Sequence, residues 1–496
     1  MLFEHLFRNA QAQPHDIAII DDTGQYTYQQ LAAMAGGLGM YLGMQTDRPR
    51  VGILLPASAG FVASFYGTLI AGKSVVPINF LLGEREIAHV IADSGIDTIV
   101  TIPQLSARLK DTPLKIVDLT QLPRNPPAAF TPKLPSPKAD DVAVVMYTSG
   151  TSGLPKGVLL TYANLQSDVD ASIAHANFQS RHKFLGIVPL FHAFGMTAMM
   201  LAPIQLGATI VYLSRFSPVA TLAAIRDHQI SLLGGVPSMF GAMLRLKDAS
   251  PQDFASIYGI ISGGEPLPAA LREAFFARFG VTLYEAYGMT ETSLAIALNT
   301  PQMHKPGSVG KPIPGMQVSI VDDAGNPLPP GASGEIWVKG PMVMKGYHNL
   351  PAETAAALTP DGHFKTGDLG YFDADGFLFI TGRKKDLIIV AGEKASPREI
   401  EETLMAHPSV AEAAVVGKPD PSRGEVVVAF IIARQGQEAS AQLLREFCRQ
   451  RGLAQWKIPR EIYIVPDLPR SPIGKVLKRE LAATAAQNNA SNESST

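Results

Sequence analysis

Short apolar strands alternate with amphipathic helical segments along the first half of this chain. Strand-like runs occur at Val51-Gly-Ile-Leu-Leu and Thr98-Ile-Val, and helical periodicity extends over Ile87 to Ser94 and over Val219 to His228. Alternation of this kind is typical of parallel sheets that are covered by helices. Because 496 residues exceed what one hydrophobic core usually serves, we expect two or more domains.

The pattern of strands and turns in the sequence changes after Gly307. As far as Thr381 it consists of short strands broken by Gly, Pro and Asp turns, which predicts a small barrel-like or antiparallel section. After Asp386 the pattern predicts a compact α+β unit, in which a helix over Pro397 to Met405 is followed by two strands, a second helix and a last strand. The polar segment Gln487 to Thr496 predicts a disordered tail.

Charge and cysteine content exclude several classes of protein. The 42 basic and 44 acidic residues give a formal charge of −2, which offers no reason to expect nucleic acid or an anionic membrane as a partner. The single cysteine, Cys448, excludes an intramolecular disulfide and favours a reducing, cytoplasmic location. Uncharged stretches at Val51–Gly72 and around Phe184–Leu213 are interrupted by prolines, so we interpret them as buried core and expect no integral membrane association. Met1–Ala12 is predicted to form an amphipathic helix.

A polar loop lies between two apolar runs in the segment Tyr147-Thr-Ser-Gly-Thr-Ser-Gly-Leu-Pro-Lys-Gly-Val158. Its glycines let backbone N–H groups turn toward an anion, and its hydroxyl groups add further donors. A loop of this composition between strands is expected to hold a polyphosphate. It is not an ordinary P-loop, because Pro155 stands where the second glycine would be and Gly157 stands where the hydroxyl residue would be.

The loop resembles the phosphate-binding loop of the adenylate-forming enzymes, which include acyl-CoA synthetases, peptide-synthetase adenylation domains and beetle luciferases. Further motifs follow in the family's order from Phe3 to Leu481. The resemblance implies an α/β fold with a large N-terminal domain, residues 1–384, of two doubly wound sheets and a small distorted β-barrel. It also implies a smaller, mobile α+β C-terminal domain over residues 385–485, before the tail at 486–496.

Carried over by position, the motifs imply a nucleotide site. Tyr287 would stack on adenine, Thr290 would contact the α-phosphate, and Glu291 together with Thr148 would bind Mg²⁺. Asp368 would accept the ribose hydroxyls, with Arg383 nearby. The full set of cofactor-binding candidates is Thr148, Ser149, Gly150, Thr151, Ser152, Gly153, Lys156, Gly263, Gly264, Glu265, Ala286, Tyr287, Gly288, Met289, Thr290, Asp368, Arg383, Lys385 and Gly392.

Local structure offers an alternative for several of these positions. Thr290 could instead be a helix N-cap, with Glu291 favouring the helix dipole. The segment Ser262–Leu267 could be a strand-to-helix turn with Pro266 near the first helical position. Thr366-Gly-Asp is a common turn sequence, and Arg383 could lie in an exposed basic turn.

The basic segment Pro469–Arg479 carries Lys475, which matches the catalytic lysine of the family. Its charge would relieve the repulsion between a carboxylate and the α-phosphate; the alternative is a solvated basic tail. Lys385 matches the hinge about which the small domain rotates between two steps. Val390–Lys394 would then line a channel for the pantetheine thiol. This chain has Ala391-Gly392 where many members have two small glycine-like residues.

The segment Pro189–Met196 resembles the start of the family's acyl pocket. Amino-acid-activating members carry an aspartate where this chain has His192, so an amino-acid substrate is not expected. His192 could contact the substrate carboxylate or be a buried, hydrogen-bonded structural residue. The presumed lining is small and apolar: Ala193, Gly195, Gly234, Gly235, Val236, Gly263 and Gly264.

These features lead to an ATP-dependent acyl-CoA ligase with four catalytic residues, Lys475, Glu291, Thr290 and His192. Its cofactors and partners would be ATP, Mg²⁺, coenzyme A and a small-molecule carboxylate, with oligomerisation left open. We favour a medium- or long-chain fatty acid over an aromatic acid. A carrier protein is the alternative acyl acceptor. A nucleotide-binding regulator without catalysis is disfavoured, because it would not need Lys475, Glu291 and Asp368 together.

Overall fold

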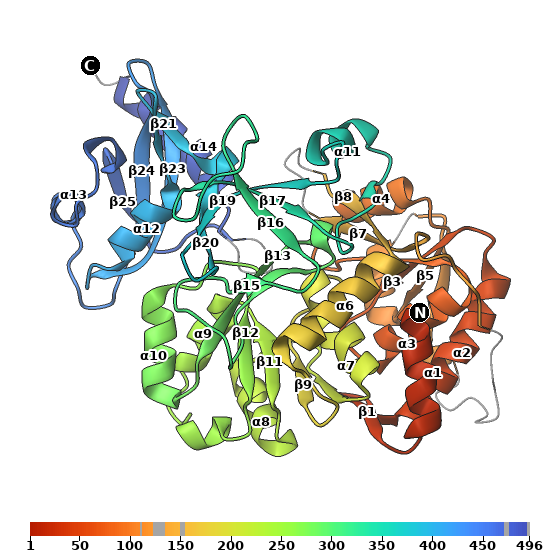
Figure 1. Ribbon diagram of the computed structural model, residues 1–496. Helices are drawn as coiled ribbons and strands as arrows, with labels where there is room; N and C mark the ends of the chain where they lie inside the picture. The colour runs from red at the N-terminus through yellow and green to blue at the C-terminus, as the bar shows by residue number, and fades with distance from the viewer. Residues whose placement is uncertain (110–111, 123–133, 149–153, 471–475, 494–496) are drawn as a thin grey trace. The chain divides into compact units, whose positions relative to one another are not determined.

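The computed structural model describes residues 1–109, 112–122, 134–148, 154–470 and 476–493 (Figure 1). The chain forms two compact units. The first comprises Met1–Val318 and Val338–Phe364, and the second comprises Ser319–Trp337 and Lys365–Thr496.

The first unit contains a nine-stranded sheet whose centre is parallel. Its outer pairs, β13 with β14, β14 with β15 and β1 with β2, are antiparallel. In spatial order the strands are β15 (Lys311–Pro312), β14 (Ala295–Leu298), β13 (Leu283–Gly288), β12 (Gly259–Ser262), β11 (Leu232–Gly235), β9 (Lys183–Gly186), β10 (Thr209–Tyr212), β1 (Ile17–Asp21) and β2 (Gly24–Thr27). Helices α8 (Pro218–His228), α9 (Pro237–Leu244) and α10 (Ala269–Phe279) bury Ile225, Phe240 and Phe275 against it.

A second, seven-stranded sheet completes this unit. Its order is β18 (Gly346–Tyr347), β8 (Lys156–Thr161), β7 (Val142–Thr148), β4 (Ser74–Pro77), β3 (Arg50–Leu54), β5 (Thr98–Thr101) and β6 (Lys115–Asp118). The strands from β7 to β6 run parallel, as the strand–helix alternation predicts. Strand β8 instead pairs antiparallel with β7, and Lys156 begins this strand rather than preceding a helix. This confirms that the loop is not an ordinary P-loop.

The apolar stretches of the sequence lie in the core, as predicted. Val51–Gly72 forms β3 and helix α3 (Ala59–Ile70), which is buried along its whole length. Phe184–Leu213 contains a π-helix, η3 (Phe194–Leu201), between β9 and β10. No helix within the described ranges combines the length and the apolar character that crossing a membrane requires. The remaining α-helices of the first unit are α1 (Leu2–Ala12), α2 (Tyr28–Gln45), α4 (Glu84–Ser94), α5 (Pro103–Ser106), α6 (Tyr162–Ala176), α7 (Ala202–Leu206) and α11 (Pro351–Ala357).

The second unit contains two smaller sheets. Of the short strands predicted over Gly307–Thr381, β15 and β18 join the sheets of the first unit. The others form a four-stranded sheet, in the order β16 (Gln317–Val321), β17 (Gly334–Lys339), β19 (Phe364–Phe372) and β20 (Leu378–Arg383). The second sheet has five strands, β22 (Glu393–Ala395), β21 (Ile388–Val390), β24 (Gly424–Ala433), β23 (Val410–Asp420) and β25 (Glu461–Ile464).

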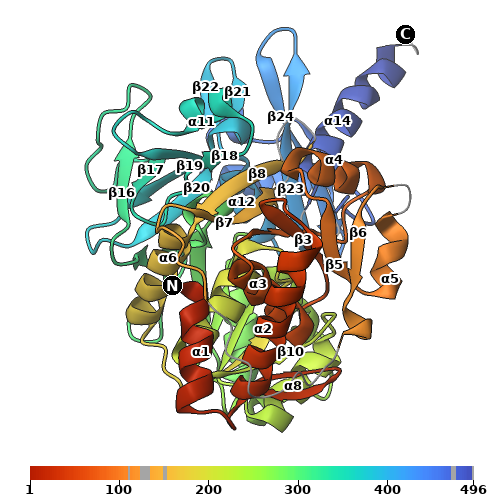
Figure 2. The same cartoon turned by 90° about the vertical axis from the view of Figure 1, so that its right-hand side faces the viewer.

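Helices cover both faces of the five-stranded sheet. Helices α12 (Pro397–Met405) and α13 (Ala441–Gln450) bury Leu404 and Leu444 with Val427 on one face. Helix α14 (Lys478–Glu493) buries Leu481 with Val428 on the other (Figure 2). The alternation along β24 predicts two such faces, because successive side chains of a strand point to opposite sides. The bounds of α12 agree with the sequence prediction.

The end of α14 differs from the sequence prediction. Its backbone stays helical to Glu493, within the segment whose polar composition predicts disorder. Four alanines, between Ala482 and Ala486, precede that segment. Because alanine has the highest helix propensity of all residues, it extends a helix that is already packed through Leu481 and Ala485.

Candidate active site

The β7–β8 hairpin holds the ends of the predicted phosphate loop in register. Thr148 is opposite Lys156, and Tyr147 is opposite Gly157. Strand β18 adds a third strand on the other side of β8, where the His348 N–H donates to the Gly157 carbonyl oxygen over 2.7 Å. The predicted site residues between them lie outside the described residues: Ser149, Gly150, Thr151, Ser152 and Gly153.

Lys156 is surrounded by groups from the segment that follows β18. Its ammonium group forms an ion pair with the Glu353 carboxylate, which lies in the first turn of α11. The same ammonium lies 5.9 Å from the centre of the Tyr347 ring. The Lys156 side chain is only 18% exposed, so its charge sits in a partly desolvated environment. A cation held in this way suits an anionic ligand.

Strand β13 and the turn after it carry the predicted adenine and α-phosphate contacts. Ala286, Tyr287 and Gly288 lie in the strand, and Met289 links it to a single 3-10 turn over Thr290–Thr292. A side chain could not replace the hydrogen of Gly288, because a Cβ there would lie 1.6 Å from the Leu294 carbonyl oxygen. The alternative of a helix N-cap at Thr290 is wrong, since Met289 is the N-cap of this 3-10 turn and strand β14 follows it.

The backbone and the side chain of Glu291 are both fixed. Its carbonyl oxygen accepts a hydrogen bond of 2.8 Å from the Met344 N–H. The Tyr347 hydroxyl donates to its Oε1 atom over 2.9 Å. Tyr347 therefore joins the carboxylate of Glu291 to the surroundings of Lys156. Among the residues that the structure describes, no group of three or more His, Cys, Asp or Glu side chains could hold a metal ion. A single carboxylate fits Mg²⁺ that keeps waters and substrate phosphates as its other ligands.

The segment after β12 comes close to β13. The Gly263 N–H donates to the Gly235 carbonyl oxygen over 3.1 Å. A Cβ added at Gly263 would lie 3.7 Å from the Ala286 carbonyl oxygen and 3.4 Å from the Phe194 ring. Gly264 has a φ of +83°, which favours glycine, and half-buried Glu265 follows it. Helix α10 begins only at Ala269, so the proposed place of Pro266 near the first helical position is wrong.

The predicted acyl-pocket residues meet at the start of the π-helix η3. A Cβ added at Gly234 would lie 2.6 Å from Met199 Cε and 2.9 Å from Phe194 Cζ. The space immediately beside Gly234 is therefore occupied by the apolar side chains of Phe194 and Met199. Ala193, Gly195 and Gly235 are likewise buried, and Val236 is partly buried. π-helical turns occur preferentially at functional sites.

His192 lies in this apolar region with an unsatisfied nitrogen. Its Nε2 atom is buried and has no hydrogen-bond partner among the described residues. Burial lowers the pKa of His192 to about 4, so the imidazole is neutral at physiological pH. The Phe191 ring centre lies 4.8 Å from the imidazole centre. A structural histidine would normally use such a buried nitrogen for a hydrogen bond, which favours a contact with substrate.

In the second unit, Asp368 and Arg383 form a pair. They are directly opposite each other on β19 and β20, and Arg383 Nε lies 2.9 Å from Asp368 Oδ1. The Asp368 side chain is 5% exposed and that of Arg383 is 45% exposed. The alternative of a simple turn at Thr366-Gly-Asp is therefore wrong, because these residues lie within β19; Arg383 is exposed, as its alternative expected, but it ends strand β20 immediately before the basic 3-10 turn.

The other predicted residues of this unit lie near its turns. Lys475 lies outside the described residues; of the flanking residues, Arg470 and Val476 form an isolated antiparallel bridge. Lys385 lies in the 3-10 turn after β20. Gly392 lies in the tight turn between β21 and β22, with φ values of +52° at Ala391 and +87° at Gly392. An alanine in this left-handed region is strained relative to glycine.

Comparisons with known proteins decide the family. The model of the AMP-binding enzyme family matches residues 6–348, and the model of the AMP-binding enzyme C-terminal domain matches residues 399–475. The chain is 36% identical to the long-chain-fatty-acid–CoA ligase of Bacillus subtilis (strain 168), over 88% of this chain and 86% of that protein.

This chain belongs to the AMP-binding enzyme family. The recognised superfamily of adenylate-forming enzymes, the fold class and the assignment as an acid–thiol ligase are thereby confirmed.

Other relatives of this AMP-binding enzyme have different substrates in their names. It is 36% identical to the sulfoacetate–CoA ligase of Cupriavidus necator, over 96% of each chain. ATP-bound MatB from Rhodopseudomonas palustris matches with a TM-score of 0.91 and 30% identity, over 97% of this chain and 98% of that one. O-succinylbenzoate coenzyme A synthetase from Bacillus subtilis, in complex with ATP and magnesium ion, matches with a TM-score of 0.84 and 32% identity, over 96% and 98%.

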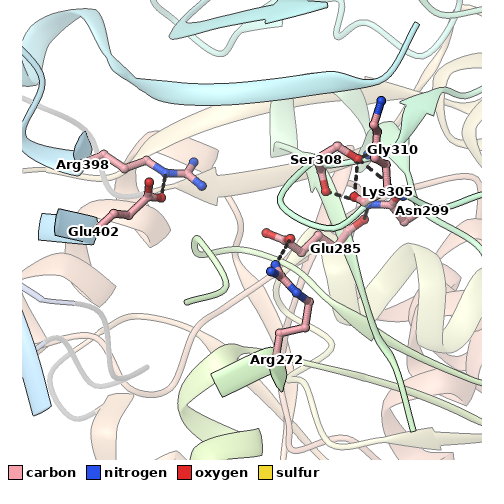
Figure 3. Close-up of polar contacts among 8 residues, drawn as sticks. All are labelled: Arg272, Glu285, Asn299, Lys305, Ser308, Gly310, Arg398 and Glu402. Carbon is pink, nitrogen blue, oxygen red and sulfur yellow. Dashed lines mark hydrogen bonds and ion pairs between the residues drawn. The ribbon is translucent and has the colours of Figure 1, made fainter. Parts of the chain in front are cut away.

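Sequence reasoning missed a buried polar network beside β13 in this AMP-binding enzyme (Figure 3). Arg272 Nη1 of α10 lies 3.5 Å from Glu285 Oε2, and both side chains are largely buried. The Asn299 amide donates to the backbone oxygens of Glu285 and Ser308 and accepts from the Lys305 N–H over 3.0 Å. Two residues could have indicated this network: Glu285, a charged residue inside a strand, and Asn299, a buried asparagine that needs hydrogen-bond partners. The network fixes the strand that carries Tyr287.

Proposed function

We propose that this AMP-binding enzyme is an ATP-dependent acyl-CoA ligase that forms an acyl-adenylate and passes the acyl group to coenzyme A. The observation that carries the proposal is the arrangement around Tyr347. Its ring lies beside the Lys156 ammonium, and its hydroxyl donates to the Glu291 carboxylate. A cation for phosphate and a carboxylate for a metal ion thus share one site beside the end of β7 and the start of β8, where Thr148 is opposite Lys156.

The first step joins two anions. A carboxylate oxygen of the acid attacks the α-phosphorus of ATP, the bond to the bridging oxygen breaks, and pyrophosphate leaves. Thr290 contacts the α-phosphate, Tyr287 stacks on adenine, and the segment with Gly263, Gly264 and Glu265 lies against the base. Lys475 places a positive charge against both oxygens and stabilises the charge that develops on the leaving group. Mg²⁺, held through Glu291 and Thr148, would neutralise phosphate charge when bound.

The second step uses the C-terminal domain. The thiol of coenzyme A attacks the carbonyl carbon of the adenylate, loses its proton, and AMP leaves. We place the domain boundary at Lys385, with residues 1–384 on one side and 385–485 on the other. Asp368, paired with Arg383, accepts the ribose hydroxyls. The tight turn at Ala391-Gly392 brings backbone close to pantetheine, which a turn without large side chains permits.

The acid is a medium- or long-chain fatty acid. Apolar, uncharged surroundings at Phe194, Met199 and Gly234 support this class, and the neutral imidazole of His192 offers a donor to the carboxylate. An aromatic acid is the second candidate, because the Phe194 ring beside Gly263 and Gly234 presents a flat surface.

Burial of the lone Cys448 raises the pKa of its thiol to about 11, which suits a protein of the cytoplasm that forms no disulfide.

A panel of carboxylic acids tests this proposal. Fatty acids of increasing length, aromatic acids and sulfonated acids are each incubated with ATP, Mg²⁺ and coenzyme A, and AMP and thioester are quantified. A fatty acid is expected to give equal amounts of both products. Release of pyrophosphate that depends on the acid, without formation of thioester, would indicate a carrier protein as the acyl acceptor in place of coenzyme A. Formation of ADP in place of AMP would refute the proposal.

The Lys475→Ala variant tests the role of the catalytic lysine. We expect acid-dependent pyrophosphate release to fall by roughly 10²–10³-fold or more, because the charge that stabilises the leaving group is lost. ATP affinity, measured without acid, serves as the control for folding. An unchanged rate of pyrophosphate release would discard the assignment.

A further inference from the structure

The edge of the phosphate hairpin is built by a short segment that none of the predicted site motifs includes. Strand β18 pairs with β8, placing Tyr347 opposite Val158, and α11 follows three residues later. The Tyr347 N–H donates to Thr354 Oγ1 over 2.9 Å, and Thr354 Oγ1 donates to the Leu350 carbonyl oxygen over 2.9 Å. These bonds fix the first turn of α11 against the hairpin, so the position of Glu353 is set by the fold.

Glu353 is the acidic partner of the phosphate-loop lysine. Its carboxylate accepts from the Lys156 ammonium, and its side chain is 39% exposed, twice as much as that of the lysine. Pairs at this level of exposure are weak, typically about 0.2–1 kcal/mol. The carboxylate can therefore give way when a ligand with more negative charge reaches Lys156.

Tyr347 interacts both with the carboxylate of Glu291 and with the ammonium of Lys156. Its hydroxyl donates to Glu291, and its ring centre lies 5.9 Å from the Lys156 ammonium. Burial and the charges of Glu291 and Glu353 raise the pKa of Tyr347, so it remains a donor. Glu291 is thus engaged by Tyr347, and Glu353 is the carboxylate that remains for Lys156.

We propose that Glu353 is a resident anion that occupies the Lys156 ammonium before nucleotide binds and gives way to the polyphosphate, and that it thereby sets the affinity for ATP. The inference rests on the proposed function, in which Lys156 belongs to the phosphate site. Glu353 acts through Lys156 and is a positioning residue. When the polyphosphate arrives, one anion replaces another beside the same cation, and the displaced carboxylate turns to solvent.

Removal of the carboxylate should therefore strengthen ATP binding. In Glu353→Gln the ammonium of Lys156 is free for phosphate, and one negative charge near the polyphosphate is gone. We expect the Kd for ATP to fall by up to roughly fivefold, as the loss of one competing, partly exposed ion pair implies. AMP lacks the polyphosphate, so its Kd should not change.

The experiment is a calorimetric titration of the full chain with ATP and with AMP, in the presence of EDTA so that no metal ion contributes. Glu353→Asp retains the charge and should bind ATP like the wild type. Glu273→Gln removes an exposed carboxylate from α10 and controls for net charge. Thermal unfolding of each variant verifies that it is folded.

The outcomes separate the two proposals. Tighter binding of ATP alone in Glu353→Gln supports the inference. An unchanged or weaker affinity for ATP, or an equal gain for AMP, overturns it, because Glu353 would then only support the loop or act through general charge. If the wild type binds neither nucleotide, the proposed function itself fails.

Discussion

The hydrogen bonding of one ring nitrogen distinguishes the two roles considered for His192, a substrate contact and a structural residue. Its Nε2 is buried without a partner among the described residues, and burial keeps the ring neutral by lowering its pKa to about 4. A buried polar atom without a partner costs about 1–3 kcal/mol. The fold therefore gains nothing from this atom, and a substrate carboxylate could use it.

Replacement of His192 by phenylalanine tests this role. His192→Phe keeps a ring of similar size and removes the unpaired nitrogen, so the unfolding temperature should stay the same or rise. The KM for the acid should increase about tenfold, the value of one hydrogen bond to a charged group, while the KM for ATP stays constant. A lower unfolding temperature with an unchanged KM for the acid would show that the histidine is structural.

Asp168 is a buried carboxyl group that the proposed chemistry does not use. Its Oδ2 accepts a hydrogen bond of 2.8 Å from the Ala295 N–H, and burial raises its pKa to about 8. In the unfolded chain the group ionises near pH 4. Between these values the native state binds the extra proton, so this group's contribution to stability is present at low pH and is lost as pH rises toward 8.

The Asp168→Asn variant should remove this pH dependence, because the amide cannot ionise and its oxygen can still accept from the Ala295 N–H. We expect the wild type to lose up to about 1.4 kcal/mol per pH unit relative to the variant between pH 5 and pH 8. Denaturant unfolding at both pH values measures the difference. Parallel changes in the two proteins would show that Asp168 is ionised in the native state.

At the scale of elements, the β21–β22 hairpin is tied to the turn between β16 and β17. Asp323 in that turn accepts from Lys394 over 2.9 Å and lies 3.3 Å from Lys384, which also pairs with Glu335. All four side chains belong to the second unit. The proposed movement of Val390–Lys394 toward pantetheine requires the Lys394–Asp323 pair to break, because Lys394 alone of these four residues follows the proposed boundary at Lys385.

Loss of Asp323 should therefore affect one step of the reaction. In Asp323→Asn we expect thioester formation to become up to about fivefold faster, which corresponds to about 1 kcal/mol for one exposed pair, and pyrophosphate release to stay the same. Single-turnover measurements of the two steps give both rates. Glu438→Gln, an exposed substitution in the same unit, is the control. Equal changes in both steps would contradict this account.

At the scale of the whole molecule, elements with strong periodicity could be predicted from sequence. The helix over Pro397–Met405, the buried strand and helix within Val51–Gly72, and the absence of a helix after Lys156 all agree with the structure. Local pattern was sufficient there, because each element is set by its own apolar spacing and by its Gly and Pro residues.

The contacts that assemble the candidate site could not be predicted. The pairing of Asp368 with Arg383 depends on the register between two strands, and that of Lys156 with Glu353 joins residues 197 positions apart in sequence. Local pattern also failed to predict the 3-10 turn at Thr290, because the same residue types occur in a helix N-cap and in such a turn. Register and long-range packing are properties of the folded chain, and one sequence contains little information on them.

The central claim is that the acid and ATP condense to a mixed anhydride before the acyl group is transferred. An acid labelled with ¹⁸O in both carboxylate oxygens tests it most directly, by mass spectrometry of the AMP that the wild-type enzyme releases with coenzyme A. Because a carboxylate oxygen attacks the α-phosphorus and leaves with AMP, each AMP should carry one ¹⁸O atom. Unlabelled AMP, or label in inorganic phosphate, would contradict the account.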